Sequence, residues 1–267
     1  MTTWRCMACI ALGSVRSLAL SLYGREFGRQ RQGYGVRFQD LYTSGAYVAK
    51  HPSWHVEESP WKAKEILRLM RRHGLAPRTV CEVGCGAGEV LKQLQKKMDS
   101  SCSFLGYEIS PQAFEMCQSR ANERLRFKLA DITKESDGGF DLILVLDVIE
   151  HIEDYFSFLR ALKPKSTYKL FHIPLDISVQ AIMRPNGLIK RREEHAHIHY
   201  FTKETALHTL SDVDYEVIGY SYAPRSNQIG TARIQRLLRW PRSLLFAIHE
   251  DTAQRILGGY SLFVLAK

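Results

Sequence analysis

Cysteine, proline and long apolar runs are all scarce in this chain of 267 residues. Its six cysteines are too few for a disulfide scaffold, and most lie in or near apolar stretches, as reduced thiols do. The hydrophobic residues, 45% of the total, occur in short runs, which excludes a polytopic membrane protein and disorder. These observations indicate one ordinary globular domain in a reducing compartment, and we expect a cytoplasmic location.

Acidic residues are almost absent from two segments that carry the excess positive charge. The net charge is +9, and residues 1–38 and 220–248 each contribute +5. A nucleic-acid enzyme usually spreads Lys and Arg around its active face, whereas here the excess is local. We therefore expect no nucleic-acid partner.

The first segment has no acidic residue before Glu26, and its apolar stretch is too short and broken to span a membrane. Its Arg-rich character leaves open an organelle-targeting peptide, a frayed tail or a start codon placed too far upstream. Cys6 and Cys9 form one CxxC without a second pair at zinc-finger spacing, so no metal is assigned there. Residues 232–250 combine Arg with Leu, Trp and Phe, which favours a helix pair packed on the domain over peripheral membrane contact.

From Thr79 onward, short β-rich apolar runs alternate with amphipathic stretches, which is typical of βαβ units and a parallel sheet. The expected strands are 79–85, 103–109, 126–132, 140–147, 166–174, 215–222 and 260–266. The expected helices are 88–98, 111–121, 153–162 and 202–212. We divide the chain into a basic tail (1–38), an N-terminal helical lid segment (39–77) and a main domain (78–267), with cap insertions at about 174–201 and 223–257.

Three glycines at alternate positions, Gly84, Gly86 and Gly88, follow the first expected strand. They allow a tight turn that a ligand can approach closely, at the N-terminus of the next helix, so a nucleotide-like ligand is implied. A dinucleotide fingerprint requires Gly or Ala at position 89, which is Glu, and Glu82 would repel a pyrophosphate. The charges suit a cationic ligand instead.

Acidic residues end three further expected strands: Glu108, Asp131 and Asp147. The carboxyl ends of parallel strands share one edge of the sheet, where open α/β folds bind ligands. At the end of the second strand, Glu108 can accept both ribose hydroxyls. The alternative for each acid is a solvated strand end or a helix cap.

The segments EVGCGAGEV, GYEIS, LADI and FDLILVLDVIEHI together resemble the class I S-adenosylmethionine-dependent methyltransferases, over about residues 78–222 plus the last strand. DVIEHI and the segment beginning EHAHIHYFTKE resemble the branch that includes ubiquinone-type O-methyltransferases. This resemblance implies an α/β fold with a Rossmann-like, seven-stranded, mostly parallel sheet and helices on both faces. It also implies the cofactor S-adenosylmethionine and a small-molecule acceptor, with a hydroxyl oxygen favoured. A macromolecular acceptor (RNA or protein), a silent binding module and an NAD-dependent oxidoreductase are the alternatives.

By the same resemblance, Glu82 and the glycine turn would hold the methionine end, Glu108 the ribose, Asp131 the adenine and Asp147 the sulfonium. The full set of expected cofactor-binding residues is Glu82, Gly84, Cys85, Gly86, Gly88, Glu108, Ile109, Asp131, Ile132, Asp147 and Val148.

On the acceptor side, Asp147 and His151 are the expected catalytic residues, because a hydroxyl acceptor must lose a proton and His titrates near neutral pH. The alternative for His151 is a residue that packs or caps the next helix. His195, His197 and His199 alternate along HAHIHY, so in a strand they would share one face. We expect His197, His199 and Tyr200 to line the acceptor pocket, and we assign no metal, although two metal ligands are an alternative.

An aromatic-rich segment precedes the first expected strand and contains Tyr42, Tyr47, His51, Trp54 and His55. It could fold over the cofactor as a lid, or pack apolar residues on the sheet. Trp61 and Ile66 are expected to belong to such packing.

Overall fold

The computed structural model describes residues 38–224 and 239–267. The chain separates into residues 1–40 and 41–267, and the second unit contains the whole sheet and all the sites considered below. The basic tail up to residue 37, its Cys6–Cys9 pair and the stretch 225–238 lie outside the described residues.

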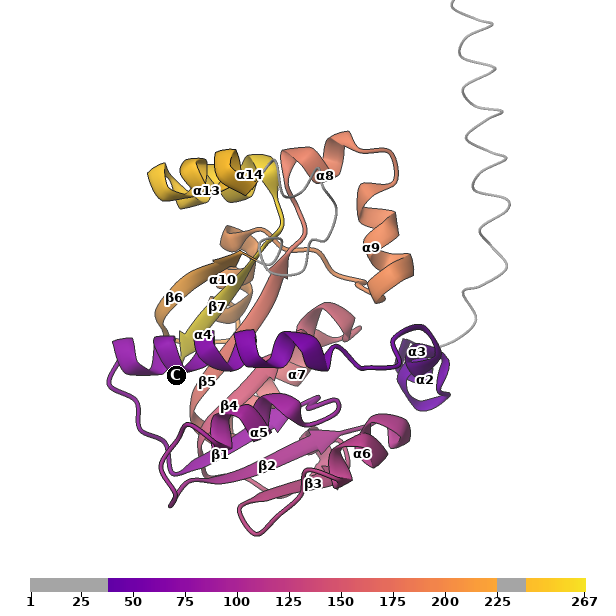
Figure 1. The fold of residues 1–267 in the computed structure, drawn as a ribbon, viewed down its shortest axis with the longest axis vertical. Helices are drawn as coiled ribbons and strands as arrows, with labels where there is room; N and C mark the ends of the chain where they lie inside the picture. Colours follow the sequence, from indigo (N-terminus) through magenta and orange to yellow (C-terminus); the bar gives the residue numbers. More distant parts are fainter. Residues whose placement is uncertain (1–37, 225–238) are drawn as a thin grey trace, which may run out of the picture. The chain divides into compact units, whose positions relative to one another are not determined.

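Seven strands form one sheet in the order β3-β2-β1-β4-β5-β7-β6 (Figure 1). Only β7 runs antiparallel to its neighbours β5 and β6. This confirms the expected Rossmann-like α/β fold. The strands are β1 (Thr79–Val83), β2 (Ser103–Glu108), β3 (Leu125–Leu129), β4 (Phe140–Leu146), β5 (Ser166–Leu175), β6 (Val217–Pro224) and β7 (Tyr260–Ala266).

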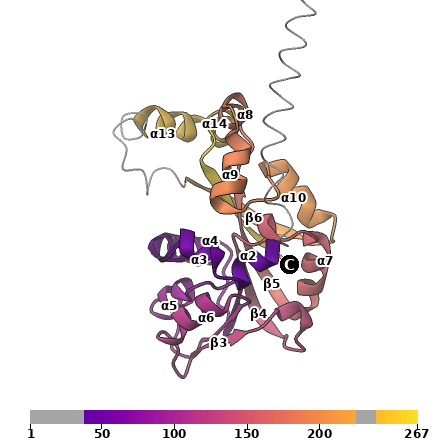
Figure 2. The same ribbon diagram turned by 90° about the vertical axis from the view of Figure 1, so that its right-hand side faces the viewer.

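Helices cover both faces of the sheet (Figure 2). One face carries α4 (Ser59–Arg72), α5 (Glu89–Gln95) and α6 (Pro111–Gln118), and the other carries α7 (Tyr155–Leu162) and α10 (Lys203–Ser211). The apolar strands supply both cores by alternation: Leu142 and Leu144 of β4 pack with α4 and α5, whereas Ile143 and Val145 pack with α7 and α10. Trp61 and Ile66 are buried in the first core, as expected.

Shorter elements connect this framework. Before α4 come α2 (Phe38–Thr43), α3 (Ala46–Lys50) and the 3₁₀ turn η2 (Val56–Glu58). The turns η3 (Ile132–Lys134) and η4 (Ile149–His151) follow β3 and β4, and η5 (Lys163–Lys165) precedes β5. The insertions hold α8 (Val179–Met183), α9 (Gly187–His195), α13 (Arg239–Ile248) and α14 (Glu250–Leu257).

Two local expectations are wrong. The third strand ends at Leu129 rather than at residue 132, because the carboxylate of Asp131 accepts the backbone N–H of Thr133 at 2.9 Å and starts η3. The HAHIH segment is not a strand: His195 ends α9, and Ala196 adopts a left-handed conformation (φ 61°) that turns the chain into a loop. The three histidines therefore point to different neighbours.

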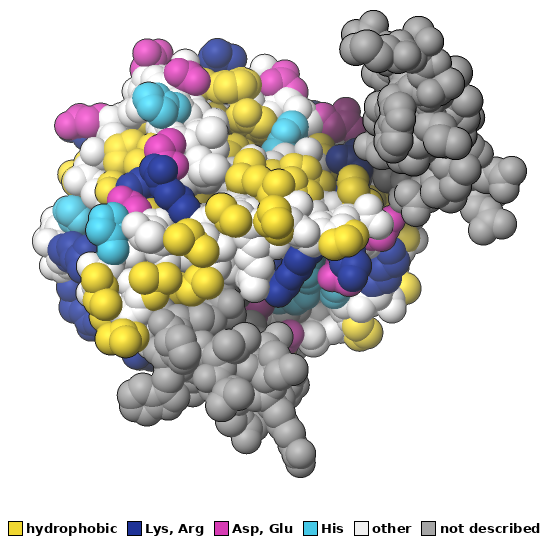
Figure 3. Space-filling view, turned by 90° about the horizontal axis from the view of Figure 1, so that it is seen from above, with side chains coloured by type: hydrophobic (Ala, Val, Ile, Leu, Met, Phe, Trp, Pro, Cys, Tyr) yellow, Lys and Arg dark blue, Asp and Glu magenta, His cyan; other side chains and the backbone are white. Residues whose placement is uncertain are grey.

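Apolar side chains gather on the face of the molecule that carries α8, α13 and α14 (Figure 3). The exposed ones from these helices are Val179, Ile182, Met183, Leu244, Ile248 and Ile256. Among the described helices, none is long and apolar enough to cross a membrane.

Removal of residues 1–38 is expected to leave folding intact. The described residues that are buried all lie between Glu58 and Ala266, so the cores close without the tail. A chain that starts at Gln39 should be soluble and unfold within a few degrees of the full chain when both are followed by circular dichroism. Insolubility, or a much lower Tm, would show that the tail belongs to the fold.

Candidate active site at the carboxyl edge of the sheet

The turn after β1 is built on positive φ angles, 66° at Gly84, 55° at Gly86 and 75° at Gly88. L-residues with side chains adopt such angles at a cost, so this path needs glycine. A Cβ atom on Gly84 would lie 3.1 Å from Val148, and one on Gly86 would lie 2.4 Å from the Trp54 indole. The turn is therefore closely approached from the strand edge and from the lid segment.

Two residues of the turn face the protein interior. A Cβ on Gly88 would lie 2.5 Å from the Phe127 ring, so Gly88 allows helix α5 to pack close to β3. The Cys85 side chain is buried, and its backbone N–H donates to the carbonyl of Tyr107 at 3.0 Å. We therefore assign Gly88 and Cys85 to the shape of the turn rather than to direct side-chain contact with a ligand.

Glu108, the last residue of β2, is buried and joins the turn to the second strand. One carboxylate oxygen accepts the N–H of Gly86 at 2.8 Å, and the other accepts those of Ile109 and Ser110 at 2.9 and 2.8 Å. Burial raises the pKa of this carboxyl, and the three backbone hydrogen bonds oppose that rise. A carboxylate has about four acceptor positions, so at least one stays available for a ligand hydroxyl.

Glu82 on β1 is a second buried acid at this edge. Burial raises its pKa to about 8, and the ammonium of Lys62 partly opposes the rise. Its Oε2 atom is buried without a hydrogen-bond partner in the described part of the chain. A buried carboxylate oxygen of this kind fits a positively charged ligand group.

Asp147 lies directly after β4 with a φ of 52°, an unusual angle for a residue with a side chain. Its carboxylate lies 2.6 Å from Lys62 Nζ and 2.9 Å from His172 Nδ1. Lys62 also pairs with Glu58 at 3.3 Å. Helix α4 and strand β5 thus fix the position of Asp147. The sequence reading missed both Lys62 and His172.

The remaining residues that are expected to bind the cofactor lie at the same edge and differ in exposure. Ile109 is 38% exposed and beside Glu108, so its side chain is accessible to a ligand. Asp131 is partly exposed and caps η3. Ile132 is 1% exposed and its side chain packs in the core, so its expected place at the adenine stays a prediction.

His151, in η4, lies four residues after Asp147 and is mostly buried. Its Nδ1 is 3.0 Å from the carbonyl oxygen of Ala196, and its ring packs edge-on against His197, with centroids 5.1 Å apart. Burial, reinforced by His197, lowers the pKa of His151 to about 4, so the ring is neutral at pH 7. His197 is therefore next to the expected catalytic histidine.

The other expected acceptor residues diverge. His199 places Nε2 2.9 Å from the carbonyl oxygen of Ile152 and packs against Tyr155. Tyr200 is half-buried. His197 packs against His151, whereas His199 lies against the start of α7.

The lid segment supplies an aromatic wall. Tyr42 packs edge-on against His151 at 5.8 Å between centroids, and Tyr47 packs against Trp54 at 4.9 Å. His51 stacks on His195 at 6.1 Å and hydrogen-bonds the carbonyl oxygen of Glu194. The aromatic side chains of this segment therefore contact both the glycine turn and the histidine cluster, and its role as a lid stays a prediction.

A cavity of about 270 Å³ lies beside the same cluster, between the end of β5, helices α8 and α9, and residues 257–260. Asp176 lines it and also holds His197 Nδ1 at 2.5 Å. Arg184, Lys190 and Arg191 contribute cationic groups to its wall. The cavity can take a small polar molecule next to the histidines.

A family model described as a methyltransferase domain matches residues 55–219, which is more than half of the chain. The chain therefore belongs to the methyltransferase-domain family, which confirms the resemblance to class I methyltransferases.

Curated relatives match over shorter stretches. Ajmaline N-methyltransferase from Rauvolfia serpentina is 34% identical over 91 residues, which are 32% of this chain and 31% of that protein. Ubiquinone biosynthesis O-methyltransferase from Pseudomonas paraeruginosa is 27% identical over 118 residues, which are 40% of this chain and 50% of that protein. The matches thus span 31% and 50% of the length of these two relatives.

Solved structures agree in fold. Magnesium protoporphyrin IX methyltransferase from Synechocystis PCC 6803 with bound SAM has a TM-score of 0.55 at 14% identity, covering 88% of this chain and 99% of that one. The [4+2]-cyclase SpnF has a TM-score of 0.53 at 13% identity, covering 77% and 80%. Because a cyclase shares the architecture, the reaction has to be argued from the site.

Proposed function

We propose that this chain transfers the methyl group of S-adenosylmethionine to a hydroxyl oxygen of a small molecule. The observation that carries the proposal is one edge of the sheet that combines a glycine turn, two buried acids and an imidazole cluster. When bound, S-adenosylmethionine supplies an electrophilic methyl group on a sulfonium. Ubiquinone biosynthesis O-methyltransferases among the relatives support an oxygen acceptor, whereas the N-methyltransferases make nitrogen the second candidate.

The cofactor side would be held by Glu82, Gly84, Gly86 and Glu108. The buried Oε2 of Glu82 fits the ammonium of the methionine end, and Glu108 has an acceptor position left for a ribose hydroxyl. Lys62 and His172 hold the carboxylate of Asp147 in place. Asp147 would lie beside the sulfonium, between the cofactor site and the acceptor side. If the lid segment covers the bound cofactor, it and the turn would exclude water from the reacting atoms.

The acceptor would occupy the space between His151, His197 and the cavity lined by Asp176. Methyl transfer is an in-line displacement, so the protein mainly orients the oxygen and assists loss of its proton. Two roles of His151 suit this position: a general base, or a ligand of a cation that acidifies the hydroxyl. A cytoplasmic location and the absence of a nucleic-acid partner remain predictions.

Affinity for S-adenosylhomocysteine is expected to rise with pH up to about 8. The pKa of Glu82 is about 8 in the free protein, beside Lys62, Glu108 and Asp147, and an ammonium favours its ionised form. Binding then releases a proton, so affinity should increase about tenfold between pH 6 and 7. Calorimetry at several pH values measures this. The Glu82→Gln variant should bind weakly and without the pH dependence. Equal affinity of the wild type at pH 6 and pH 8 would show that the ammonium group does not bind at Glu82.

The function is tested with S-adenosylmethionine labelled in its methyl group and paired small acceptors that differ only in carrying a hydroxyl or an amine. We expect label in the O-methyl product of at least one pair, identified by mass spectrometry. Label confined to amines would establish N-methylation, and label in protein or RNA would establish a macromolecular acceptor. Either result overturns the proposal.

A further inference from the structure

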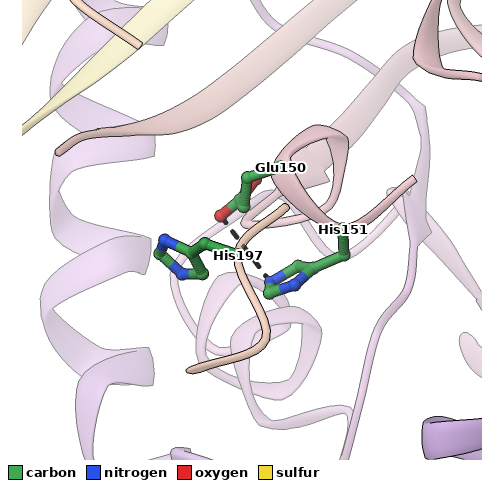
Figure 4. Close-up of side chains that lie close together, drawn as sticks. All are labelled: Glu150, His151 and His197. Carbon is green, nitrogen blue, oxygen red and sulfur yellow. Dashed lines mark ion pairs between the residues drawn. The ribbon is translucent and has the colours of Figure 1, made fainter. Parts of the chain in front are cut away.

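Three side chains with metal-binding atoms meet beside the proposed acceptor site. Glu150 and His151 come from η4, and His197 comes from the loop after α9 (Figure 4). One potential ligand atom from each lies within 4.8 Å of the other two. Glu150 is fully buried and His197 is 4% exposed, so the group lies inside the protein.

A hydrogen-bond acceptor at Nδ1 orients each of the two imidazole rings. Nδ1 of His151 is 3.0 Å from the carbonyl oxygen of Ala196, and Nδ1 of His197 is 2.5 Å from Asp176. An acceptor at Nδ1 places the ring proton there, which leaves the lone pair on Nε2 in a neutral ring. This pattern, an outer carbonyl or carboxylate on one nitrogen and an open lone pair on the other, is typical of histidines that bind metals.

The backbone holds the two segments together independently of the side chains. The carbonyl oxygen of Glu150 accepts the N–H groups of Ile198 at 2.8 Å and His199 at 3.2 Å. Ala196, with φ at 61°, bends the chain so that His197 reaches Glu150. Left-handed alanine costs free energy, and such strain is concentrated at functional sites. The arrangement is therefore built before any ligand arrives.

An ion pair between Glu150 and His151 is the simplest alternative, since Nε2 and Oε1 are 3.8 Å apart. That distance is too long for a hydrogen bond. Two ligand atoms 3.8 Å apart can each reach one metal ion at the usual bond length of about 2.0–2.2 Å, so the separation suits a shared ion.

We propose that Glu150, His151 and His197 bind one divalent transition-metal ion of the zinc type. Two imidazoles and one carboxylate are ligands that suit Zn²⁺ and its neighbours better than Mg²⁺ or Ca²⁺, which prefer oxygen. Three protein ligands leave a coordination position open, as in catalytic zinc sites. This assigns to His197 a role other than the acceptor wall expected from the sequence.

The role of the ion rests on the proposed function, although its binding does not. A hydroxyl bound at the open position has a lowered pKa. Its proton passes to water, the oxygen forms the bond to the methyl carbon, and the carbon–sulfur bond breaks to leave S-adenosylhomocysteine. No oxidant or reductant is needed.

The test uses the full chain, stripped with a chelator and dialysed, then titrated with Co²⁺ and Zn²⁺. We expect one ion per chain by calorimetry, and a visible Co²⁺ spectrum without thiolate charge-transfer bands. The absence of those bands separates this group from Cys6 and Cys9. Glu150→Gln and His197→Ala should each weaken binding at least tenfold, whereas His199→Ala, in the same loop, should bind as wild type.

Circular dichroism of the stripped variants checks that they remain folded, and the isosteric Glu150→Gln keeps the test informative if His197→Ala unfolds. No stoichiometric binding, binding of Mg²⁺ alone, or binding unchanged in both variants overturns the site. Metal binding is measured without methyl transfer, so failure here is distinguishable from failure of the proposed function. If the ion binds but its removal leaves methylation unchanged, the assigned role is wrong.

Discussion

Replacing His151 with alanine is expected to lower the methylation rate about a hundredfold or more, with affinity for S-adenosylhomocysteine near that of the wild type. His151 lies in η4, one turn beyond Asp147, and packs against His197 at the acceptor side. Whether it removes the proton or holds a cation, it acts in the transition state. Its contacts do not include Glu82 or the glycine turn, so cofactor binding should be spared. Single-turnover kinetics and calorimetry measure the two quantities.

His199→Ala is the matched control for this prediction, because it removes an imidazole from the same segment. His199 contacts Ile152 and Tyr155 rather than His151. We expect it to change acceptor affinity more than the rate, since a pocket wall contributes to ground and transition states alike. Full activity of His151→Ala would show that His151 takes no part in the reaction.

Replacing Glu108 with alanine should weaken binding of S-adenosylhomocysteine by about 1.5–3 kcal/mol, the loss expected for hydrogen bonds to a charged group. That is roughly tenfold to 150-fold in Kd. Glu108 would accept ribose hydroxyls and also ties the turn to β2 through Gly86. Both losses act on the same site. Calorimetric titration of the variant gives the value.

A control is needed because Glu108 accepts three backbone N–H groups. The Glu108→Gln variant retains one acceptor oxygen and should bind more tightly than Glu108→Ala. Glu115→Ala removes an exposed carboxylate from the nearby α6 and should leave binding unchanged. A wild-type Kd for Glu108→Ala would place the ribose elsewhere.

The sheet could be predicted from the sequence because buried parallel strands are continuous apolar runs. β4, Phe140–Leu146, supplies both cores and was recognisable for that reason. The ends of elements were less predictable, since side-chain caps decide them. Asp131 reads equally well as a strand end or as the cap it proves to be. The same holds for HAHIH, whose alternation suits a strand, although Ala196 turns the chain there.

The glycine turn and Glu108 could be predicted because both are marked by short motifs at a fixed distance from one another in the sequence. Lys62 was missed because its partner Asp147 lies 85 positions away and no local pattern joins them. His172 carried a signal: a polar ring in the apolar run of β5 requires a buried partner, here Asp147 and Ser261. Asp176 directly follows β5, just as Asp147 directly follows β4. The same pattern, an acidic residue at the carboxyl end of a strand, could therefore have identified Asp176 as a candidate.

Calorimetric titration of the full chain with S-adenosylhomocysteine and, separately, with NAD decides whether the glycine turn and its acids form an S-adenosylmethionine site. We expect one molecule of S-adenosylhomocysteine bound per chain and no binding of NAD, because Glu82 favours a cationic methionine end and disfavours a pyrophosphate. Equal affinity for NAD, or no binding of S-adenosylhomocysteine, would contradict it.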